Sequence, residues 1–214
     1  MRLKNVKNAK TIMEQGKYYI EDASIYKGNW RTYFNNDNPI YIEIGMGKGD
    51  FIIKNALENP NINYIGIEKF DSVIVRAIQK SNELEIDNLK LIRMDAEKIE
   101  EVFDKEIDRI YLNFSDPWPK ERHAKRRLTS PIFLDRYKNI FKGDVIIEMK
   151  TDNDDLFNYS YETLIENNYD ITYKTNDLHN EDIYNITTEY EEKFVSMGIK
   201  INKLIAVYKN ENGK

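Results

Sequence analysis

The chain has 214 residues, no cysteine and only two histidines, and its formal net charge is −5. This composition excludes disulfides, thiolate catalysis and zinc sites built from cysteine or several histidines, so we expect no metal. The acidic balance argues against a nucleic-acid partner, because nucleic-acid binders are usually basic overall. No stretch reaches the roughly 18 apolar residues of a membrane span and the N-terminus lacks an apolar signal core, so we expect a cytoplasmic protein without a membrane partner.

Residues 1–39 contain no strand pattern, and we interpret them as an N-terminal arm. Short apolar runs then alternate with helix-length segments, which is typical of parallel strands joined by crossover helices. The expected strands are residues 40–44, 64–67, 89–94, 107–114 and 145–149, followed by a helix at 154–167, a strand at 171–174, an irregular acidic segment and a strand at 203–208. We therefore predict one α/β domain over residues 40–214, whose last two strands form an antiparallel edge.

The first expected strand ends in a glycine-rich turn, E-I-G-M-G-K-G-D-F, over residues 43–51. Gly45 and Gly47 allow a tight turn and close approach of a ligand, and the next helix is expected to begin at Asp50. The turn does not fit the dinucleotide fingerprint G-x-G-x-x-G, because Asp50 occupies the position of the last glycine. Glu43, two residues before the first glycine, suits the ammonium group of S-adenosylmethionine. A tight turn without a ligand is the alternative.

Acids also end the next two expected strands. Glu68, about 20 residues beyond the glycines, can accept hydrogen bonds from both hydroxyls of an unphosphorylated ribose. Asp95 in M-D-A-E stands where a carboxylate could accept an adenine amino hydrogen. Either acid alone is an ordinary strand-end residue, but three acids at three successive strand ends favour a nucleoside ligand.

Residues 113–127, N-F-S-D-P-W-P-K-E-R-H-A-K-R-R, follow the fourth expected strand. Two prolines stiffen the loop, so Asp116, Trp118 and Lys120 are expected on a rigid shelf, where Trp118 either stacks on a base or fills the core. Five cations among residues 120–127 indicate a phosphate-bearing partner, and a solvated basic turn is the alternative.

With these motifs the sequence resembles the bacterial tRNA (guanine-N(7)-)-methyltransferases of the TrmB family. The resemblance is carried by E-I-G-M-G-K-G, Glu68, M-D-A, S-D-P-W-P-K with R-H-A-K-R-R, K-T-D and T-E-Y-E, and spans about residues 28–209. It implies a class I S-adenosylmethionine-dependent methyltransferase fold (Rossmann-like), with a seven-stranded, mostly parallel sheet and helices on both faces. It also implies methylation of guanine N(7) in the tRNA variable loop, with tRNA as the partner.

The resemblance also implies roles for single residues. Its cofactor positions match Glu43, Gly45, Gly47, Glu68, Asp95 and Asp116; its substrate positions match Lys120, Asp152, Thr188, Glu189, Tyr190 and Glu191; its RNA-contacting stretch matches Arg122, His123, Lys125, Arg126 and Arg127. From the residues alone, a helix cap or turn is the favoured interpretation of Asp152, and an acidic surface is that of T-E-Y-E.

Asp116 is the expected catalytic residue, in an electrostatic and orienting role. Guanine N(7) has an in-plane lone pair that is unprotonated at neutral pH, and a sulfonium methyl group is a strong electrophile, so the transfer requires alignment and not a general base. Asp116 could accept hydrogen bonds from guanine N1 and N2, or hold the cofactor ammonium group, and the sequence does not separate these roles.

Three other functions fit parts of the sequence: a class I methyltransferase for a small molecule or protein, a non-catalytic RNA-binding subunit, and a dinucleotide oxidoreductase. The intact glycine loop with its acids argues against the second, and the glycine spacing argues against the third. A homodimer is possible, because relatives in this family include dimers. No heptad or apolar patch in the sequence decides the oligomeric state.

Overall fold

The computed structural model describes residues 6–210. The outer ends of the expected arm (1–39) and of the expected domain (40–214) lie outside these residues. The division at residue 40 therefore stays a prediction. Within residues 6–210, none of the helices combines the length and the apolar character that crossing a membrane requires.

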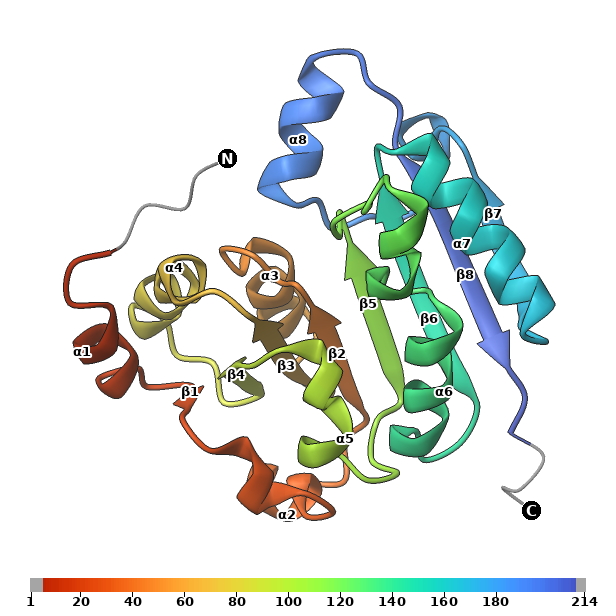
Figure 1. Ribbon diagram of the computed structural model, residues 1–214. Helices are drawn as coiled ribbons and strands as arrows, with labels where there is room; N and C mark the ends of the chain where they lie inside the picture. Colours follow the sequence, from red (N-terminus) through yellow and green to blue (C-terminus); the bar gives the residue numbers. More distant parts are fainter. Residues whose placement is uncertain (1–5, 211–214) are drawn as a thin grey trace.

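An eight-stranded sheet forms the centre of the fold, in the order β1-β4-β3-β2-β5-β6-β8-β7 (Figure 1). The strands are β1 (Tyr19–Ile20), β2 (Ile40–Ile44), β3 (Asn63–Glu68), β4 (Leu89–Arg93), β5 (Arg109–Asn113), β6 (Val145–Thr151), β7 (Asp170–Thr175) and β8 (Asn202–Tyr208). All neighbouring pairs from β1 to β6 are parallel, whereas β8 is antiparallel to β6 and β7 is antiparallel to β8. The mostly parallel sheet and its antiparallel edge are confirmed.

The sheet has one strand more than the seven expected. The additional strand, β1, lies in the arm, for which we predicted no strand, and pairs Tyr19 with Leu91 and Ile20 with Ile92 of β4. Two residues are too few to show a period-two pattern, so the sequence carried no signal for this strand. The strand is fixed instead by burial of Tyr18 and Ile20 against the sheet.

Helices cover both faces of the sheet. They are α1 (Ala9–Glu14), α2 (Trp30–Phe34), α3 (Asp50–Glu58), α4 (Asp71–Asn82), α5 (Ile99–Val102), α6 (Pro131–Ile140), α7 (Asp154–Glu166) and α8 (Glu189–Ser196), with short 3₁₀ turns η1 (Ala23–Tyr26), η2 (Ala96–Lys98), η3 (Glu121–Arg126) and η4 (Leu178–Asn180). The starts of α3 at Asp50 and of α7 at Asp154 agree with the sequence prediction.

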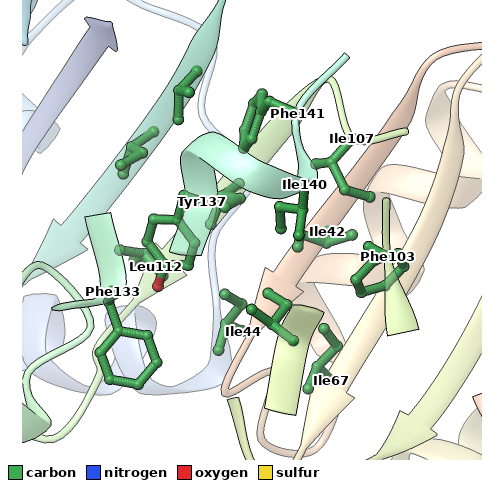
Figure 2. Close-up of a cluster of buried hydrophobic side chains, with 14 of the residues drawn as sticks. Ile42, Ile44, Ile67, Phe103, Ile107, Leu112, Phe133, Tyr137, Ile140 and Phe141 are labelled. Carbon is green, nitrogen blue, oxygen red and sulfur yellow. The ribbon is translucent and has the colours of Figure 1, made fainter. Parts of the chain in front are cut away.

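Two hydrophobic clusters hold these layers together. In β2 alternate side chains point to opposite faces, so Ile42 and Ile44 share one face. They pack in one cluster with Phe133 and Tyr137 of α6 (Figure 2). The second cluster joins α3 and α4 to the other face. The central strands are thus covered on both faces.

The described part of the arm is anchored to this domain through Trp30. Its side chain is 0% exposed, and its Nε1 donates to the carbonyl oxygen of Val102 at 3.0 Å. The buried carboxylate of Glu106 accepts hydrogen bonds from the backbone N–H groups of Gly28 (2.9 Å) and Trp30 (2.8 Å). Residues 28–30 are therefore fixed by packing and by satisfied backbone donors.

Candidate active site

The expected cofactor and catalytic residues gather at one edge of the sheet, where the parallel strands end. Gly45 follows β2, Glu68 ends β3, Asp95 follows β4 and Asp116 follows β5. The chain moves outward from β2 to β3 and β4, then returns to β5 on the other side of β2. Such a reversal is the topological switch point at which open α/β sheets bind ligands. In Figure 1, α8 lies beyond the tips of β5 and β6.

The glycine loop is a preformed turn that is open toward a ligand. Gly45 and Gly47 have φ values of 78° and 59°, which L side chains rarely adopt, and a Cβ added to either would meet nothing within 4 Å. Oε2 of Glu68 accepts the N–H of Gly47 at 3.1 Å, and its Oε1 accepts the N–H groups of Lys69 (2.8 Å) and Phe70 (3.0 Å). Glu68 thus ties the loop after β2 to the loop after β3.

Glu43 is a buried carboxylate with an unsatisfied oxygen. Its side chain is 2% exposed, and Nδ2 of Asn113 donates to its Oε1 at 2.9 Å. Among the described residues nothing hydrogen-bonds to Glu43 Oε2 or to Asn113 Oδ1. Burial raises the pKa of Glu43 to about 7. Because buried polar atoms are normally satisfied, these two acceptors fit a ligand that brings a cation or hydrogen-bond donors.

Asn113 is a site residue that sequence reasoning missed. It begins the stretch 113–127, but it is uncharged and ends a strand, so the sequence suggested no role for it. Its signal lies in the strand pairing: Glu43 is the register partner of Tyr111, and Asn113 is two residues further along the same face of β5.

Asp95 lies beside a pocket of 560 Å³, lined in part by Phe70 and Met94. Its Oδ1 accepts the N–H of Glu97 at 3.1 Å, and its Oδ2 lies 2.5 Å from Nζ of Lys69. Arm residues 21–24 line the same pocket. The arm therefore contributes to the surroundings of an expected cofactor residue.

The loop after β5 is held in an unusual conformation by Arg127. Phe114 and Trp118 have φ values of 51° and 43°, and such a backbone costs on the order of 1–3 kcal/mol for each non-glycine residue. Nε and Nη2 of Arg127 donate to the carbonyl oxygens of Pro117 (3.0 Å) and Trp118 (3.1 Å). The guanidinium carbon also lies 4.1 Å from the ring centroid of Tyr159. One arginine thus clamps two consecutive carbonyl groups of the loop that carries the expected catalytic residue.

Asp116 itself is exposed at the carboxyl edge. Burial raises the pKa of Glu68, and the negative charge of Asp116 raises it further. The side chain of Trp118 is half-buried between Arg126, whose guanidinium carbon is 4.9 Å from its ring centroid, and His123, whose ring is 5.8 Å away. The indole therefore packs on the basic turn in this structure.

The basic turn is η3 with the residues that flank it. Four of its cations are exposed: Lys120, Arg122, Lys125 and Arg126. His123 and Arg127 are half-buried. The four exposed cations are available to an anionic partner, while the guanidinium of Arg127 is engaged with the neighbouring loop.

T-E-Y-E begins helix α8, so the expectation of an irregular acidic segment is wrong for residues 189–196. Oγ1 of Thr188 accepts the N–H of Glu191 at 2.9 Å, and Oε2 of Glu191 accepts the N–H of Thr188 at 3.4 Å. This reciprocal pair is a capping box, which satisfies two donors at the helix start. The capping-box signature T-x-x-E is present in the sequence. The expectation of an irregular segment followed the acidic composition and ignored this signature.

Of the T-E-Y-E side chains, those of Glu189 and Tyr190 make contacts at the surface, and that of Glu191 is buried. Glu189 forms an ion pair with Lys48 of the glycine loop at 2.8 Å. The ring of Tyr190, a residue that is 57% exposed, lies 5.9 Å from that of Phe114. Glu191 is 0% exposed, so it is not part of the acidic surface. Helix α8 thus contacts both the glycine loop and the loop after β5.

Asp152 is half-buried between β6 and α7. The N-cap of α7 is Asn153, whose Oδ1 accepts the N–H of Leu156 at 2.7 Å. Of the alternative, a helix cap or turn, the cap is therefore wrong for Asp152, which lies instead in a bend between the two elements. Its contact with a substrate stays a prediction.

Comparison with solved structures identifies the fold. A 16S rRNA methyltransferase, KamB, has a TM-score of 0.67 at 11% identity, covering 86% of this chain and 94% of that chain. A 16S rRNA (adenine(1408)-N(1))-methyltransferase from Catenulisporales acidiphilia, solved with the cosubstrate SAM, has a TM-score of 0.62 at 10% identity, covering 86% and 91%. The class I methyltransferase fold is confirmed.

Comparison with sequences is more specific. A family model described as "Putative methyltransferase" matches residues 37–204. The tRNA (guanine-N(7)-)-methyltransferase of Lachnoclostridium phytofermentans is 51% identical, over 99% of this chain and 100% of the relative. The enzyme of the same name from Listeria monocytogenes serotype 4b is 50% identical, over 97% and 99%. The chain therefore belongs to the bacterial tRNA (guanine-N(7)-)-methyltransferase family.

Proposed function

We propose that the protein transfers the methyl group of S-adenosylmethionine to N(7) of a guanine in the variable loop of tRNA. The observation that carries the proposal is the buried Glu43, whose Oε2 has no partner in the described part of the chain, beside a glycine loop that is open to a ligand. The ammonium group of the cofactor would satisfy that oxygen. The exposed Asp116 and the basic turn at the same edge suit a nucleic-acid substrate, and the names of the relatives support tRNA.

The residues present fit the cofactor group by group. Glu43 would pair with the ammonium group. Oε1 of Glu68 already accepts two backbone N–H groups, whereas its Oε2 accepts one and keeps a lone pair for a ribose hydroxyl. Asp95 would accept a hydrogen bond from the adenine amino group. Gly45 and Gly47 leave room for the methionine end of the cofactor. When bound, S-adenosylmethionine supplies an electrophilic methyl group on a sulfonium centre.

The protein's part in the reaction is alignment and charge. The stiff loop after β5 presents Asp116, which would accept hydrogen bonds from N1 and N2 of the guanine and thereby raise the electron density at N(7). Lys120, exposed four residues further on, would meet O6 or a phosphate. N(7) needs no deprotonation, so these residues can support the reaction without a general base among them.

The test combines the purified protein, labelled S-adenosylmethionine and tRNA from a strain that lacks this modification. Nucleoside analysis by mass spectrometry should show 7-methylguanosine. Cofactor binding without tRNA methylation would favour the small-molecule or protein methyltransferase, and loss of both would favour the RNA-binding subunit. The homodimer stays a prediction, which the mass of the protein in solution tests.

Removing a cation from the basic turn should weaken tRNA binding and make it less sensitive to salt. Arg122→Ala or Lys125→Ala removes an exposed charge, so log Kd should depend less steeply on log salt concentration, by about 1 for each phosphate that the variant no longer neutralises. Filter binding over a salt series measures the slope. Arg76→Ala, an exposed arginine on α4, is the matched control. If Arg76→Ala changed the slope as much as the turn variants, the turn would not be the RNA-binding surface.

Affinity for S-adenosylmethionine should fall as the pH falls below about 7. Burial raises the pKa of Glu43 to about 7, with Asn113 and Lys150 favouring the charged form and Glu68 and Asp50 opposing it. Only the carboxylate pairs with the ammonium group, so binding below the pKa must release a proton. Affinity should therefore decrease by up to about tenfold per pH unit below that pKa and level off above it. Titration calorimetry from about pH 5.5 to about pH 8.5 measures this.

Glu43→Gln provides the control for the pH effect. The amide cannot titrate, so the variant should bind more weakly at neutral pH and show a flat profile between about pH 6 and about pH 8. An unchanged slope in Glu43→Gln would assign the proton to another group.

A further inference from the structure

Helix α8 is joined to the protein in an unusual way. Its one fully buried side chain is that of Glu191, a charged residue. Phe194 and Val195 are half-buried, and Tyr190 is 57% exposed. Helices in proteins are ordinarily held by an apolar face that packs on the core. The position of α8 must therefore depend strongly on what Glu191 meets inside the protein.

Glu191 meets Lys150, the penultimate residue of β6. Nζ of Lys150 lies 2.6 Å from Oε2 of Glu191, and the two residues are 1% and 0% exposed. The same ammonium group donates to the carbonyl oxygen of Ile186 (2.9 Å) and to Oδ1 of Asn185 (3.2 Å). Lys150 thus holds both the first turn of α8 and the chain that leads into it.

The second oxygen of Glu191 is also satisfied. Nδ2 of Asn185 donates to Oε1 at 2.6 Å, and Nε2 of His179 lies 2.9 Å from the same oxygen. A carboxylate and an ammonium group in the interior are tolerated only when each is paired and hydrogen-bonded. Removing one member leaves the other uncompensated, so the cluster has a strong preference for the assembled arrangement.

Lys150 is itself rigidly placed. It pairs with Asn113 of β5 on one side and with Lys203 of β8 on the other, in the interior of the sheet. Asn113 is the residue that donates to Glu43. The anchor of α8 is therefore built on the same strands as the candidate cofactor site.

The remaining charged contacts of α8 are at the surface. The pairs Lys48–Glu189 and Lys54–Glu192 have all four side chains about half exposed. Exposed ion pairs of this kind contribute about 0–1 kcal/mol and weaken with salt. They therefore follow the position of the helix and do not determine it.

We propose that Lys150 is a positioning residue for methyl transfer: through Glu191 it holds α8 in place, so that the helix supports the glycine loop and the loop after β5. The effect on catalysis rests on the proposed function. The contacts that depend on this anchor are Glu189 to Lys48 and Tyr190 to Phe114. Lys150 itself is buried and acts through α8 without touching the reacting groups.

The test replaces Lys150 by methionine, which keeps the length and removes the charge. Hydrogen exchange of the amides in residues 181–198 should accelerate by at least about 100-fold, because Glu191 is left buried without its cation. In the same variant, kcat for tRNA methylation should fall at least about tenfold, with a smaller change in the KM for tRNA, because the basic turn is untouched. Hydrogen exchange is measured without tRNA, so it tests the anchoring of α8 independently of the reaction. If the wild-type protein failed to methylate tRNA, only the proposed function would be overturned.

Two controls separate positioning from general stability. Lys203→Met removes another buried lysine, whose ion-pair partner at 2.7 Å is Glu148 of β6. Lys54→Met removes an exposed charge that reaches α8 itself. Neither should accelerate exchange in residues 181–198 by more than about threefold relative to the rest of the chain.

The double variant Lys150→Met, Glu191→Met keeps the proposal testable if the single variant folds poorly. With both members of the buried pair replaced, exchange in residues 181–198 should return to within about tenfold of the wild type. Unchanged exchange in Lys150→Met, acceleration spread evenly over the chain, or accelerated exchange of residues 181–198 with an unchanged kcat would each overturn the proposal.

Discussion

Asp116→Asn is expected to slow methyl transfer to tRNA by about 10- to 150-fold in single-turnover experiments. The substitution keeps the shape of the side chain and removes its charge, and a hydrogen bond to a charged group contributes about 1.5–3 kcal/mol. The loop that carries Asp116 is fixed by two prolines and by the guanidinium of Arg127, so we expect no movement of the loop that would compensate. Rapid-quench measurement with saturating cofactor gives the rate of the chemical step.

The same variant separates the two roles that the sequence left open for Asp116. If Asp116 orients guanine, the rate should fall while the Kd for S-adenosylmethionine changes by less than about threefold; if it holds the ammonium group, that Kd should rise in parallel. Asp37→Asn, at an exposed aspartate preceding β2 and hence at the opposite edge of the sheet, is the matched control. A single-turnover rate of Asp116→Asn within about twofold of wild type would exclude an electrostatic role.

The sequence predicts those parts of the fold in which local pattern and tertiary structure agree. The run 40–44 is a strand with those same bounds, because its alternate residues pack on both faces of the sheet. The glycine loop ends where predicted, at the start of α3 at Asp50, because positive φ values require glycine there. Strand ends fix the place of Glu68, Asp95 and Asp116, since parallel strands bring their carboxyl ends to one edge.

What the sequence does not reveal depends on partners that are distant in the chain. Strand β1 exists only through its pairing with β4, and Asn113 matters only because β5 lies beside β2. The residues Lys150 and Glu191 are 41 positions apart. From the sequence, each is expected to be an exposed charged residue, whereas the fold buries both. Composition therefore assigned Glu191 to an acidic surface, although its carboxylate is an internal anchor.

Arg127 is a second charged residue whose contacts in the structure differ from those expected from the sequence. The sequence placed it among five cations for RNA, whereas its guanidinium donates to Pro117 and Trp118 and stacks on Tyr159. We expect Arg127→Lys to lower the single-turnover rate by about 10- to 100-fold, because lysine cannot bridge two carbonyl groups and the loop would lose its alignment. The Kd for tRNA at fixed salt should change by less than about threefold, because the positive charge is kept.

Arg136→Lys is the matched control for this clamp. Arg136 on α6 is also half-buried and lies over an aromatic ring, 5.3 Å from the centroid of Phe133, but its ion-pair partner is Glu100 of α5 and not the loop after β5. The single-turnover rate of Arg136→Lys should stay within about threefold of that of the wild type. A pure phosphate contact at Arg127 would give the reverse pattern for Arg127→Ala, a higher Kd and a lower salt slope with an unchanged rate at saturating tRNA. That pattern would return Arg127 to the RNA-binding surface and leave the positive φ values of Phe114 and Trp118 to be maintained by the two prolines.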